Sequence, residues 1–455
     1  MPYLYNTAEE QQEMLQFIGA ASLDELFSDI PSDIQMDRPL NLPPALNELA
    51  LTQHMTALGN KNLVGGEVPC FLGGGSYDHF IPSVVDAISS RGEFYTSYTP
   101  YQPEVSQGNL QAIFEYQTLI CNLTGMDVSN ASLYDGGSAA LEATLMAMRA
   151  TRRTEKVVTV SSVHPEYRQI LETYYTTLNV KLETVEHQGG RAPLEALENV
   201  VDEKTACILI QSPNFFGSLE DVEKIAEIAH AKGALLVVAF DPISLGLIKR
   251  PGDQGADIAV AEGHTLGTPM HYGGPFLGIL ACREKLIRNV PGRIAGETVD
   301  KNGKRCFVLT LQTREQHIRR EKATSNICTN QGLFALRACV YLSTLGPAGL
   351  KEVATASLQK AHYAFETLTA TDRFEPLFDH PFVKEFVIRD RENKVDQLIQ
   401  QAAAQGYLAG IPLGNWYPEL GDCLLLAVTE KRTKQEIDTL TEILTNTTSL
   451  ESAHA

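Results

Sequence analysis

The feature of this sequence that most restricts its fold is a series of short apolar segments that alternate with helix-forming stretches. The apolar segments lie at residues 157–160, 206–210, 234–240, 258–260 and 276–281. Such alternation is typical of an α/β fold with a mostly parallel sheet covered by helices. Residues 234–240 are apolar throughout, which predicts a central strand that is buried on both faces.

One helix between two of these strands is well specified by the sequence. Ser218 followed by Asp221 resembles a capping box, the signal that begins many helices. The residues after it place an apolar stripe at helical spacing: Val222, Ile225, Ala226, Ile228 and Ala229. We therefore expect this helix to pack its apolar side against the sheet.

The chain divides into three predicted regions. Residues 1–70 are polar and helix-forming, with breaks at Pro31, Pro43 and Pro44, and are interpreted as an N-terminal helical arm without a core of its own. Arms of this kind often wrap around a partner subunit. Residues 71–330 are expected to form a large α/β domain. Residues 331–455 carry strand signals at 382–388 and 423–428 and helix signals at 395–405 and from Lys434, which predicts a smaller C-terminal α/β domain.

Composition narrows the class of protein. The chain has 455 residues, 44% of them hydrophobic and 20% charged, which is ordinary for a globular protein. The formal net charge of −19 disfavours nucleic acid and anionic membranes as partners. The N-terminus lacks the features of a secretion signal, and no apolar run approaches the roughly 20 residues of a membrane span, so a cytoplasmic location is expected. The eight cysteines form no CxxC pair, so neither a metal site nor a disulfide framework is predicted.

A glycine turn at Gly136, Gly137 and Ser138 opens onto a helix-forming run. Free backbone N–H groups, a serine hydroxyl and the positive end of a helix together favour binding of a phosphate group. The same residues also suit an ordinary helix N-cap, which is the more frequent use of such a pattern. The turn is thus a candidate phosphate site with a structural alternative.

Two further candidates follow predicted strands. His164 comes directly after residues 157–160, where its imidazole ring can lie flat against an aromatic ligand. A histidine at a strand end is more often a hydrogen-bonded structural residue. Asp241 follows the apolar strand at 234–240 and can pair with a protonated pyridine nitrogen, although it can equally cap the next turn.

The order of these elements resembles the layout of the fold-type I pyridoxal phosphate (PLP) enzymes: a glycine phosphate loop, a strand-end histidine, a strand-end aspartate and then a strand-end lysine. Here the lysine position is taken by His264. An imine with the cofactor aldehyde requires a primary amine, which histidine lacks. Lys249 follows Asp241 too closely for the intervening strand to be completed, and Lys322 belongs to a different segment. This chain alone is therefore not expected to perform Schiff-base chemistry, and no catalytic residue is assigned to it.

Several long stretches make the resemblance specific. They are FLGGG at 71–75 with YDH at 77–79, YTSYTPYQPEVSQG at 95–108, and TREQHIRREKATSNICT at 313–329. On these motifs the chain is similar, nearly from end to end, to the P-protein of the glycine cleavage system, a glycine dehydrogenase (decarboxylating). That family occurs as one long chain or as two subunits, and the cofactor lysine belongs to the second half. Without that lysine, this sequence is similar to the first half, called subunit 1.

The resemblance implies a function that needs other chains. Glycine reacts with PLP, loses carbon dioxide and passes its aminomethyl group to the lipoyl arm of the carrier H-protein. The resemblance implies that PLP is anchored on glycine dehydrogenase subunit 2 and that the assembly is an α2β2 heterotetramer. It leaves open whether the pocket of this chain still holds free PLP.

The segment from Tyr95 to Gln107 is dense in tyrosine and proline, and it precedes a helix that Leu110, Ile113 and Phe114 are expected to anchor. Prolines stiffen a loop and reduce the entropy lost when the loop is positioned. Tyr95 and Tyr98, and less strongly Tyr101, are candidates to donate hydrogen bonds to a cofactor phosphate or a substrate carboxylate in the neighbouring subunit. The alternative is that these tyrosines only pack the subunit interface.

The segment from Arg314 to Lys322 concentrates positive charge in an acidic chain. It is either a solvated helix face or a docking surface for a carrier that tends to be acidic in this family. Gly73 to Gly75 and Gly273 to Gly274 lack the GxGxxG arrangement, so dinucleotide binding is not expected.

Two other functions stay open at this point. One is an autonomous PLP enzyme, such as an aminotransferase or a desulfurase, that uses an unexpected lysine. The other is a regulatory or scaffold subunit that retains the fold without touching an active site. The long shared motifs favour the complementing half of a P-protein over both.

Overall fold

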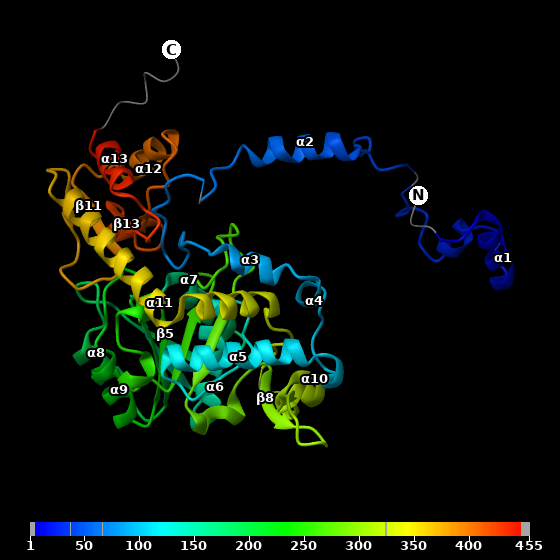
Figure 1. Ribbon diagram of the computed structural model, residues 1–455, viewed down its shortest axis with the longest axis horizontal. Helices are drawn as coiled ribbons and strands as arrows, with labels where there is room; N and C mark the ends of the chain where they lie inside the picture. Colours follow the sequence, from blue (N-terminus) through cyan, green and yellow to red (C-terminus); the bar gives the residue numbers. More distant parts are fainter. Residues whose placement is uncertain (1–4, 37, 66, 324, 447–455) are drawn as a thin grey trace, which may run out of the picture. The chain divides into compact units, whose positions relative to one another are not determined.

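A computed structural model describes residues 5–36, 38–65, 67–323 and 325–446 (Figure 1). By its internal contacts the chain divides into two compact units, one ending at Asn62 and the other beginning at Leu63. The two units are described separately.

The first unit is built from local signals. Its helices are α1 (Ala8–Ile18) and α2 (Glu48–Gly59), and neither contains a buried residue. A complete capping box begins α1, because the Thr7 hydroxyl accepts from Glu10 N while the Glu10 carboxylate accepts from Thr7 N. Large apolar side chains such as Phe17 and Leu49 stay exposed. These features fit the interpretation as an arm, whose boundary at residue 70 stays a prediction.

The second unit is organised around a seven-stranded sheet with the strand order β1-β7-β6-β5-β4-β2-β3. The strands from β2 to β6 are mutually parallel, whereas β7 is antiparallel to both β6 and β1. The prediction of a mostly parallel sheet is therefore confirmed. The strands are β1 (Val128–Ser129), β2 (Lys156–Val160), β3 (Lys181–Val185), β4 (Thr205–Ser212), β5 (Leu235–Phe240), β6 (Ile258–Glu262) and β7 (Gly278–Cys282).

Helices cover both faces of this sheet (Figure 1). Alternate residues of β5 point in opposite directions, so Leu236 and Val238 belong to one core cluster and Leu235 and Val237 to the other. The first face packs against α5 (Gln107–Thr124), α8 (Leu194–Val200), α9 (Val222–Ala231) and the beginning of α11 (Gly332–Thr369). The second face packs against α6 (Gly136–Thr151) and α7 (Pro165–Tyr175). All six residues of β5 are buried, as predicted for a central strand.

Helix α11 bends at Gly346, where the backbone has φ 60° and ψ −175°, next to Pro347. The bend has two causes, since proline removes a helical hydrogen bond and Gly346 adopts a conformation outside the helical region. By length and composition α11 is the one helix among the described residues that is long and apolar enough to cross a membrane. It instead contributes buried residues to the core, including Tyr341 and Leu368.

A second, four-stranded antiparallel sheet has the order β10-β11-β13-β12. Its strands are β10 (Phe374–Pro376), β11 (Glu385–Asp390), β12 (Ile411–Pro412) and β13 (Cys423–Ala427). The end of α11, α12 (Val395–Ala404) and α13 (Lys434–Thr445) pack against one face. The predicted strands and helices of this region are thus present, while the domain boundary at residue 330 stays a prediction.

Some local predictions need correction. Asp221 rather than Ser218 is the N-cap of α9, because its carboxylate accepts from Lys224 N, so the capping box from Ser218 to Asp221 is wrong. Strand β7 begins at Gly278 and not at residue 276. The strand β3 and the hairpin of β8 (Ile294–Val299) and β9 (Arg305–Thr310) were not predicted.

The remaining α-helices of the second unit are short. They are α3 (Ser83–Ser89), α4 (Gly92–Tyr95) and α10 (Gln316–Arg319).

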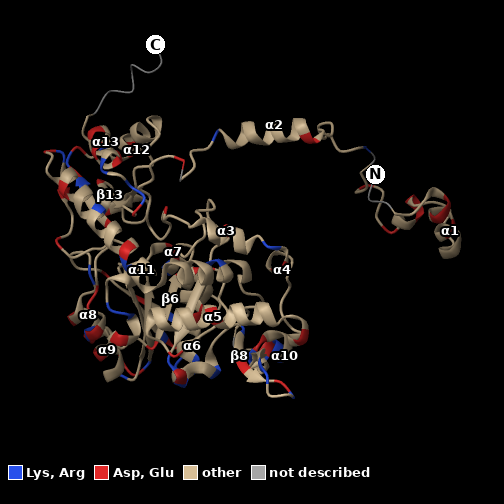
Figure 2. Ribbon diagram, viewed as in Figure 1, with Lys and Arg blue, Asp and Glu red and all other residues tan. Residues whose placement is uncertain are grey.

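Acidic and basic residues are interspersed over the second unit (Figure 2). No single basic face of the kind that binds nucleic acid stands out among the described residues in this view.

Candidate functional site

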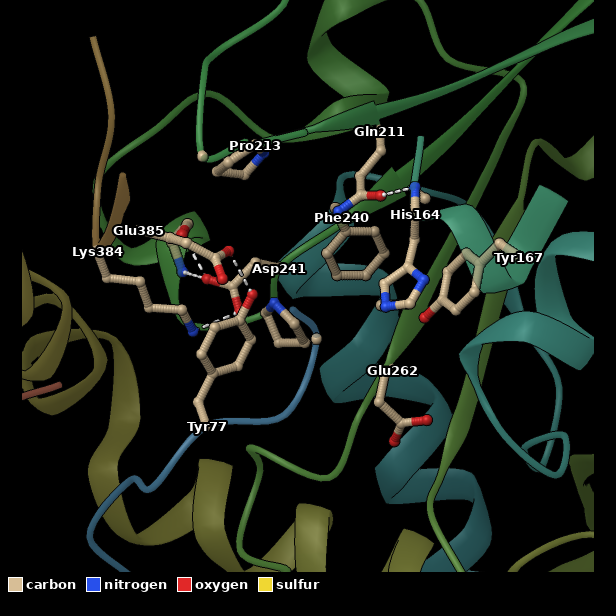
Figure 3. Close-up of a pocket in the computed structure, with 16 residues that line it drawn as sticks. Tyr77, His164, Tyr167, Gln211, Pro213, Phe240, Asp241, Glu262, Lys384 and Glu385 are labelled. Atoms are coloured by element: carbon tan, nitrogen blue, oxygen red, sulfur yellow. Dashed lines mark hydrogen bonds and ion pairs between the residues drawn. The ribbon is translucent and has the colours of Figure 1, made fainter. Parts of the chain in front are cut away.

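The carboxyl ends of β4, β5 and β6 meet at a pocket, the position where open α/β sheets bind ligands. The side chains around it come from these strand ends, from the start of α7 and from the segment that leads into β11 (Figure 3). Its free space measures about 40 Å³. A water molecule requires roughly 10–15 Å³ of such space, whereas small-molecule pockets usually offer about 300–1,000 Å³. The pocket as it stands has room for a few waters only.

Asp241 follows β5 directly and faces into this pocket (Figure 3). Its Oδ1 accepts a hydrogen bond of 2.8 Å from Lys384 Nζ, and its Oδ2 accepts from Ser244 N at 2.9 Å. Burial raises the pKa of Asp241, but the charge and hydrogen bond of Lys384, together with the contributions of Ser244 and His79, hold the pKa below its ordinary value. Asp241 is therefore an ionised carboxylate with a cation already in place.

Lys384 lies at the centre of a buried charge network. Its ammonium also donates to His79 Nε2 at 3.0 Å and lies 3.7 Å from the centre of the Tyr77 ring. Because His79 Nε2 accepts this bond, its Nδ1 carries the proton and donates to Glu430 Oε2 at 2.7 Å. Burial raises the pKa of Glu430, while His79 lowers it below the ordinary value. The network connects the loop at 77–79, the end of β5 and the second sheet.

Glu385 adds a second carboxylate to this wall. It accepts from Tyr77 Oη at 2.8 Å and from Gly74 N at 2.6 Å. Burial raises its pKa to about 7 despite these two donors. The FLGGG and YDH motifs thus contribute structural contacts to the wall of the pocket.

The glycine turn at the start of α6 lies behind the same pocket, next to Glu262, which lines it. Gly136 N donates to Glu262 Oε2 at 2.9 Å, and Ser138 N donates to Asp135 Oδ1 at 2.7 Å. The Ser138 hydroxyl donates to Asp135 Oδ2 at 3.0 Å. Asp135 is thus the N-cap of α6, and two of the N–H groups expected to face a phosphate already have carboxylate partners. Gly137 packs tightly, because a Cβ there would come within 2.5 Å of Ile170 Cδ1.

Glu262 is the last residue of β6 and is nearly buried. Besides Gly136 N, it accepts from His264 N at 2.9 Å and from Leu277 N at 3.0 Å through Oε1. Burial raises the pKa of Glu262 to about 7, although these three donors act in the opposite direction. The carboxyl group therefore occupies the positive end of α6, where an anion is favoured.

His164 is the N-cap of α7 and is held by its own chain. Its Nδ1 accepts from Glu166 N at 3.2 Å, so its Nε2 carries the proton and donates to the Gly74 carbonyl at 2.7 Å. The ring is stacked on Tyr167 with centroids 4.8 Å apart and an angle of 21° between the planes (Figure 3). Burial lowers the pKa of His164. The stacking partner of His164 in this structure is therefore a tyrosine of the same helix.

His264, at the position expected for lysine, is fully buried. Its Nε2 accepts from Tyr77 N at 3.1 Å, and its Nδ1 lies 3.3 Å from the Thr268 carbonyl, to which it donates. Burial lowers its pKa to about 3, so the ring is neutral near pH 7. His264 is a structural residue that joins two loops, and it offers no amine.

The residues of this pocket do not fit PLP as they stand. The donors at the start of α6 are occupied by Glu262 and Asp135, Asp241 holds Lys384, and Tyr167 covers His164. Lys384 is the one lysine among the pocket residues. Lys384 binds Asp241, the predicted partner of the ring nitrogen, so it would lie at the nitrogen end of the pyridine ring. The aldehyde is para to that nitrogen and would lie at the opposite end. Lys249 is exposed and pairs with Glu223 at 2.7 Å.

A second site is a groove on the surface of the same unit. It holds about 940 Å³ and is lined by α3, α4, the loop that follows α4, and the start of α11. Tyr95 and Tyr98 line it with exposed fractions of 67% and 84%. Within the described part of the chain, neither hydroxyl forms a hydrogen bond. The two tyrosines predicted to reach a ligand are thus available in this chain, and their role stays a prediction.

Tyr101 differs from these two tyrosines. Its hydroxyl accepts from Arg293 Nη2 at 2.9 Å, and the Arg293 guanidinium lies 5.4 Å from the centre of its ring. Arg293 is buried and also contacts Asn330. The prediction that α5 anchors the segment is confirmed, since Leu110 and Ile113 are buried and Phe114 is partly buried against the same cluster. Tyr101 therefore fixes the loop, while Tyr95 and Tyr98 project from it.

The basic segment from Arg314 to Lys322 separates into two parts. Arg314 is buried and donates to the Leu311 carbonyl at 3.0 Å and the Gly292 carbonyl at 3.1 Å, and burial lowers its pKa. Arg319, Arg320 and Lys322 are exposed at the end of α10 and in the turn after it. Only these three side chains are available for a docking surface.

The sequence predicted that His164, Asp241, His264 and the glycine turn lie close together. In the structure His164 and Asp241 line the pocket, whereas His264 and the glycine turn lie behind it and are bonded to the lining residues Tyr77 and Glu262. It missed Lys384, Tyr167 and Glu262. Tyr167 lies close to His164 in the sequence and Glu262 lies close to His264, and a carboxylate at the end of a predicted strand was a usable signal for Glu262. Lys384 lies 143 residues after Asp241, and nothing local in the sequence marks it.

The arrangement of the sheet and its pocket defines the class of protein first. The chain superposes on glutamate decarboxylase from Lactobacillus brevis with a TM-score of 0.67 over 91% of this chain and 96% of that one, at 12% identity. At such low identity the likeness shows the fold alone. The fold is that of the PLP-dependent enzymes of fold type I.

Comparisons at higher identity define the family. The family model described as "Glycine cleavage system P-protein" matches residues 1–444. A probable glycine dehydrogenase (decarboxylating) subunit 1 from Carboxydothermus hydrogenoformans is 54% identical over 444 residues, 98% of this chain and 99% of that protein. A crystal structure of glycine decarboxylase (P-protein) of the glycine cleavage system, in inhibitor-bound form, is 44% identical, with a TM-score of 0.89 over 98% of this chain and 99% of that one. The chain belongs to the glycine cleavage system P-protein family.

Proposed function

We propose that this chain is the complementing half of a two-subunit glycine decarboxylase. In this proposal it completes an active site whose cofactor lysine lies on a second subunit. The observation that carries the proposal concerns the position expected for lysine: His264 is buried, neutral and without an amine, next to a pocket with no room for a cofactor. The naming of close relatives as subunit 1 supports the need for a second subunit.

Tyr95 and Tyr98 are the residues that we assign to the shared active site. Their hydroxyl groups are exposed over a groove of about 940 Å³ and hold no partner in the described part of the chain. PLP, bound on the second subunit, withdraws electrons from the α-carbon of an amino acid. The tyrosines would donate hydrogen bonds to its phosphate or to the glycine carboxylate, and the loop fixed by Tyr101 and Arg293 would hold them in place.

The remaining partners follow from the family. We propose that glycine dehydrogenase subunit 2 covers the groove, that the assembly is an α2β2 heterotetramer, and that lipoylated H-protein accepts the aminomethyl group. The exposed apolar side chains of α1 and α2 suit an arm that packs against the partner subunit. A cytoplasmic location is proposed for the assembly.

The test is reconstitution with the lysine-bearing subunit. Each subunit is purified alone, loaded with PLP and mixed, and the exchange of labelled bicarbonate with the glycine carboxyl group is measured with lipoylated H-protein. Exchange is expected only for the pair, together with an absorption band near 410 nm, a wavelength typical of PLP imines in general, carried by the second subunit.

Two outcomes would reject the proposal. Exchange by this chain alone would make it an autonomous enzyme. Full exchange by the second subunit alone would make this chain a scaffold. Borohydride reduction followed by peptide mapping identifies the subunit that bears the pyridoxyl group in either case.

A further inference from the structure

The pocket at the ends of β4, β5 and β6 is filled by three side chains whose chemistry is complementary to its walls. At one end, the Glu262 carboxyl group accepts from Gly136 N at 2.9 Å at the start of α6. At the other end, the Lys384 ammonium donates to Asp241 Oδ1 at 2.8 Å. Between them the Tyr167 ring is stacked on His164 at 4.8 Å (Figure 3). A carboxyl group that accepts hydrogen bonds, an aromatic ring and a cation thus meet a helix N-terminus, an imidazole and a carboxylate.

A phosphorylated pyridine carries three corresponding features, because it has an anionic phosphate, an aromatic ring and a protonated ring nitrogen. We propose that Glu262, Tyr167 and Lys384 act together as an internal substitute for such a ligand. They satisfy the polar groups that the fold presents at this point and exclude the ligand from this chain. The inference concerns the chain without its partner, so it does not depend on the proposed function.

The energetic reason is the cost of buried polar groups. Asp241 is mostly buried, with 11% of its side chain exposed, and without a cation its charge would be unpaired at the edge of the protein interior. The N–H groups at the start of α6 likewise require an acceptor. Side chains that supply both partners from within the chain stabilise the fold without any ligand. They also leave only about 40 Å³ of free space.

The three substitutes come from separate parts of the chain. Glu262 ends β6, Tyr167 lies in the first turn of α7, and Lys384 precedes β11 in the second sheet. Removing one of them therefore opens one end of the pocket and leaves the others in place. This separation makes the proposal testable end by end.

The experiment measures binding of two ligands by the full-length chain alone. Pyridoxine 5′-phosphate and pyridoxine both lack the aldehyde, so neither forms imines with surface lysines, and they differ only in the phosphate. Equilibrium dialysis gives their dissociation constants for the unsubstituted chain, Glu262→Ala, Lys384→Ala and the double variant. Circular dichroism and gel filtration establish that each variant is folded.

Each opened end is expected to strengthen binding by roughly ten- to a hundredfold, the value of one charge-assisted hydrogen bond. Glu262→Ala should strengthen binding of pyridoxine 5′-phosphate but not of pyridoxine, because only the phosphate uses the start of α6. Lys384→Ala should strengthen binding of both ligands through Asp241. The matched control is Glu142→Ala with Lys156→Ala, which removes a buried carboxyl group of α6 and a partly buried lysine away from the pocket, and it should change neither constant.

Two results would overturn the proposal. One is saturable binding of pyridoxine 5′-phosphate to the unsubstituted chain with an affinity equal to that of the double variant. The other is a folded double variant that binds no better than the control. If the double variant does not fold, the unsubstituted chain and the single variant Glu262→Ala decide: binding by the first overturns the proposal, and selective binding of the phosphate by the second supports it.

Discussion

The pocket and the groove are two cavities of one unit with opposite properties. The pocket has about 40 Å³ of free space, and its carboxyl groups, its imidazole and its lysine all have hydrogen-bond partners within the chain. The groove has about 940 Å³, and its two tyrosine hydroxyls are exposed. The pocket therefore has the properties of a protein interior, whereas the groove has those of a binding surface. The comparison shows that the position at which a fold usually binds its ligand is not necessarily the functional site of a particular chain.

The largest effect is expected from removing the cation of the pocket. Lys384→Met leaves Asp241 buried without its cation, and the free energy of unfolding should fall by about 3–5 kcal/mol in urea denaturation. The control Lys249→Met breaks an exposed ion pair with Glu223 and should cost at most about 1 kcal/mol. Equal losses in the two variants would show that the pocket network does not stabilise the fold. The added change Asp241→Asn should restore part of the stability of Lys384→Met.

A smaller effect, on activity alone, is expected in the groove. Tyr98→Phe should reduce kcat/KM of the reconstituted pair by roughly ten- to a hundredfold, because one hydrogen bond to a charged group is lost. The free energy of unfolding should not change, since Tyr98 is exposed. Tyr407→Phe, in the region of the second sheet, is the control and should retain full activity. Unchanged exchange of bicarbonate in Tyr98→Phe would leave the tyrosines as interface residues only.

The pH dependence of stability distinguishes the pocket from a surface. The pKa of Glu262 in the folded chain is about 7, above the ordinary value of 4.5. The folded chain therefore holds a proton that the unfolded chain loses, so this contribution to stability is complete below about pH 4.5 and is lost as the pH rises through about 7. Between pH 5 and pH 8 the unsubstituted chain should lose about 2–3 kcal/mol more than Glu262→Gln does. The exposed Glu419→Gln should follow the unsubstituted chain, and parallel curves for all three would contradict the shift.

The smallest effect is expected at the exposed basic residues after α10. Arg319→Glu should raise the apparent KM for H-protein by roughly two- to fivefold at low ionic strength, and salt should abolish the difference. Lys301→Glu, an exposed reversal in the β8–β9 turn, serves as the control. A KM that does not move in Arg319→Glu would assign the segment to an ordinary solvated surface.

The sequence predicted those parts of the fold that depend on local patterns. The run at 234–240 became β5 because its residues are apolar on both faces, and the stripe from Val222 to Ala229 became α9 because its spacing is helical. Strand β3, with the sequence KLETV, was missed because it lies at the edge of the sheet and is only partly buried. Its polar residues carry no apolar signal.

The contents of the pocket were harder to predict for a different reason. His164 and Asp241 follow strands, and strand ends of a parallel sheet meet, so their proximity was predictable. Lys384 reaches Asp241 from the second sheet, and this contact depends on how two separately patterned regions pack. No periodicity or local motif records such a contact, and the same is true of the bond between Arg293 and Tyr101.

Helix α11 serves two cores at once. Before its bend at Gly346 it contributes Ala335 and Tyr341 to the core of the first sheet, and after the bend Ala361 and Leu368 to that of the second. Because one helix packs in both cores, unfolding of either core exposes apolar surface of the other. The two sheets should consequently denature as one cooperative block, and a break in the backbone at the bend would loosen both.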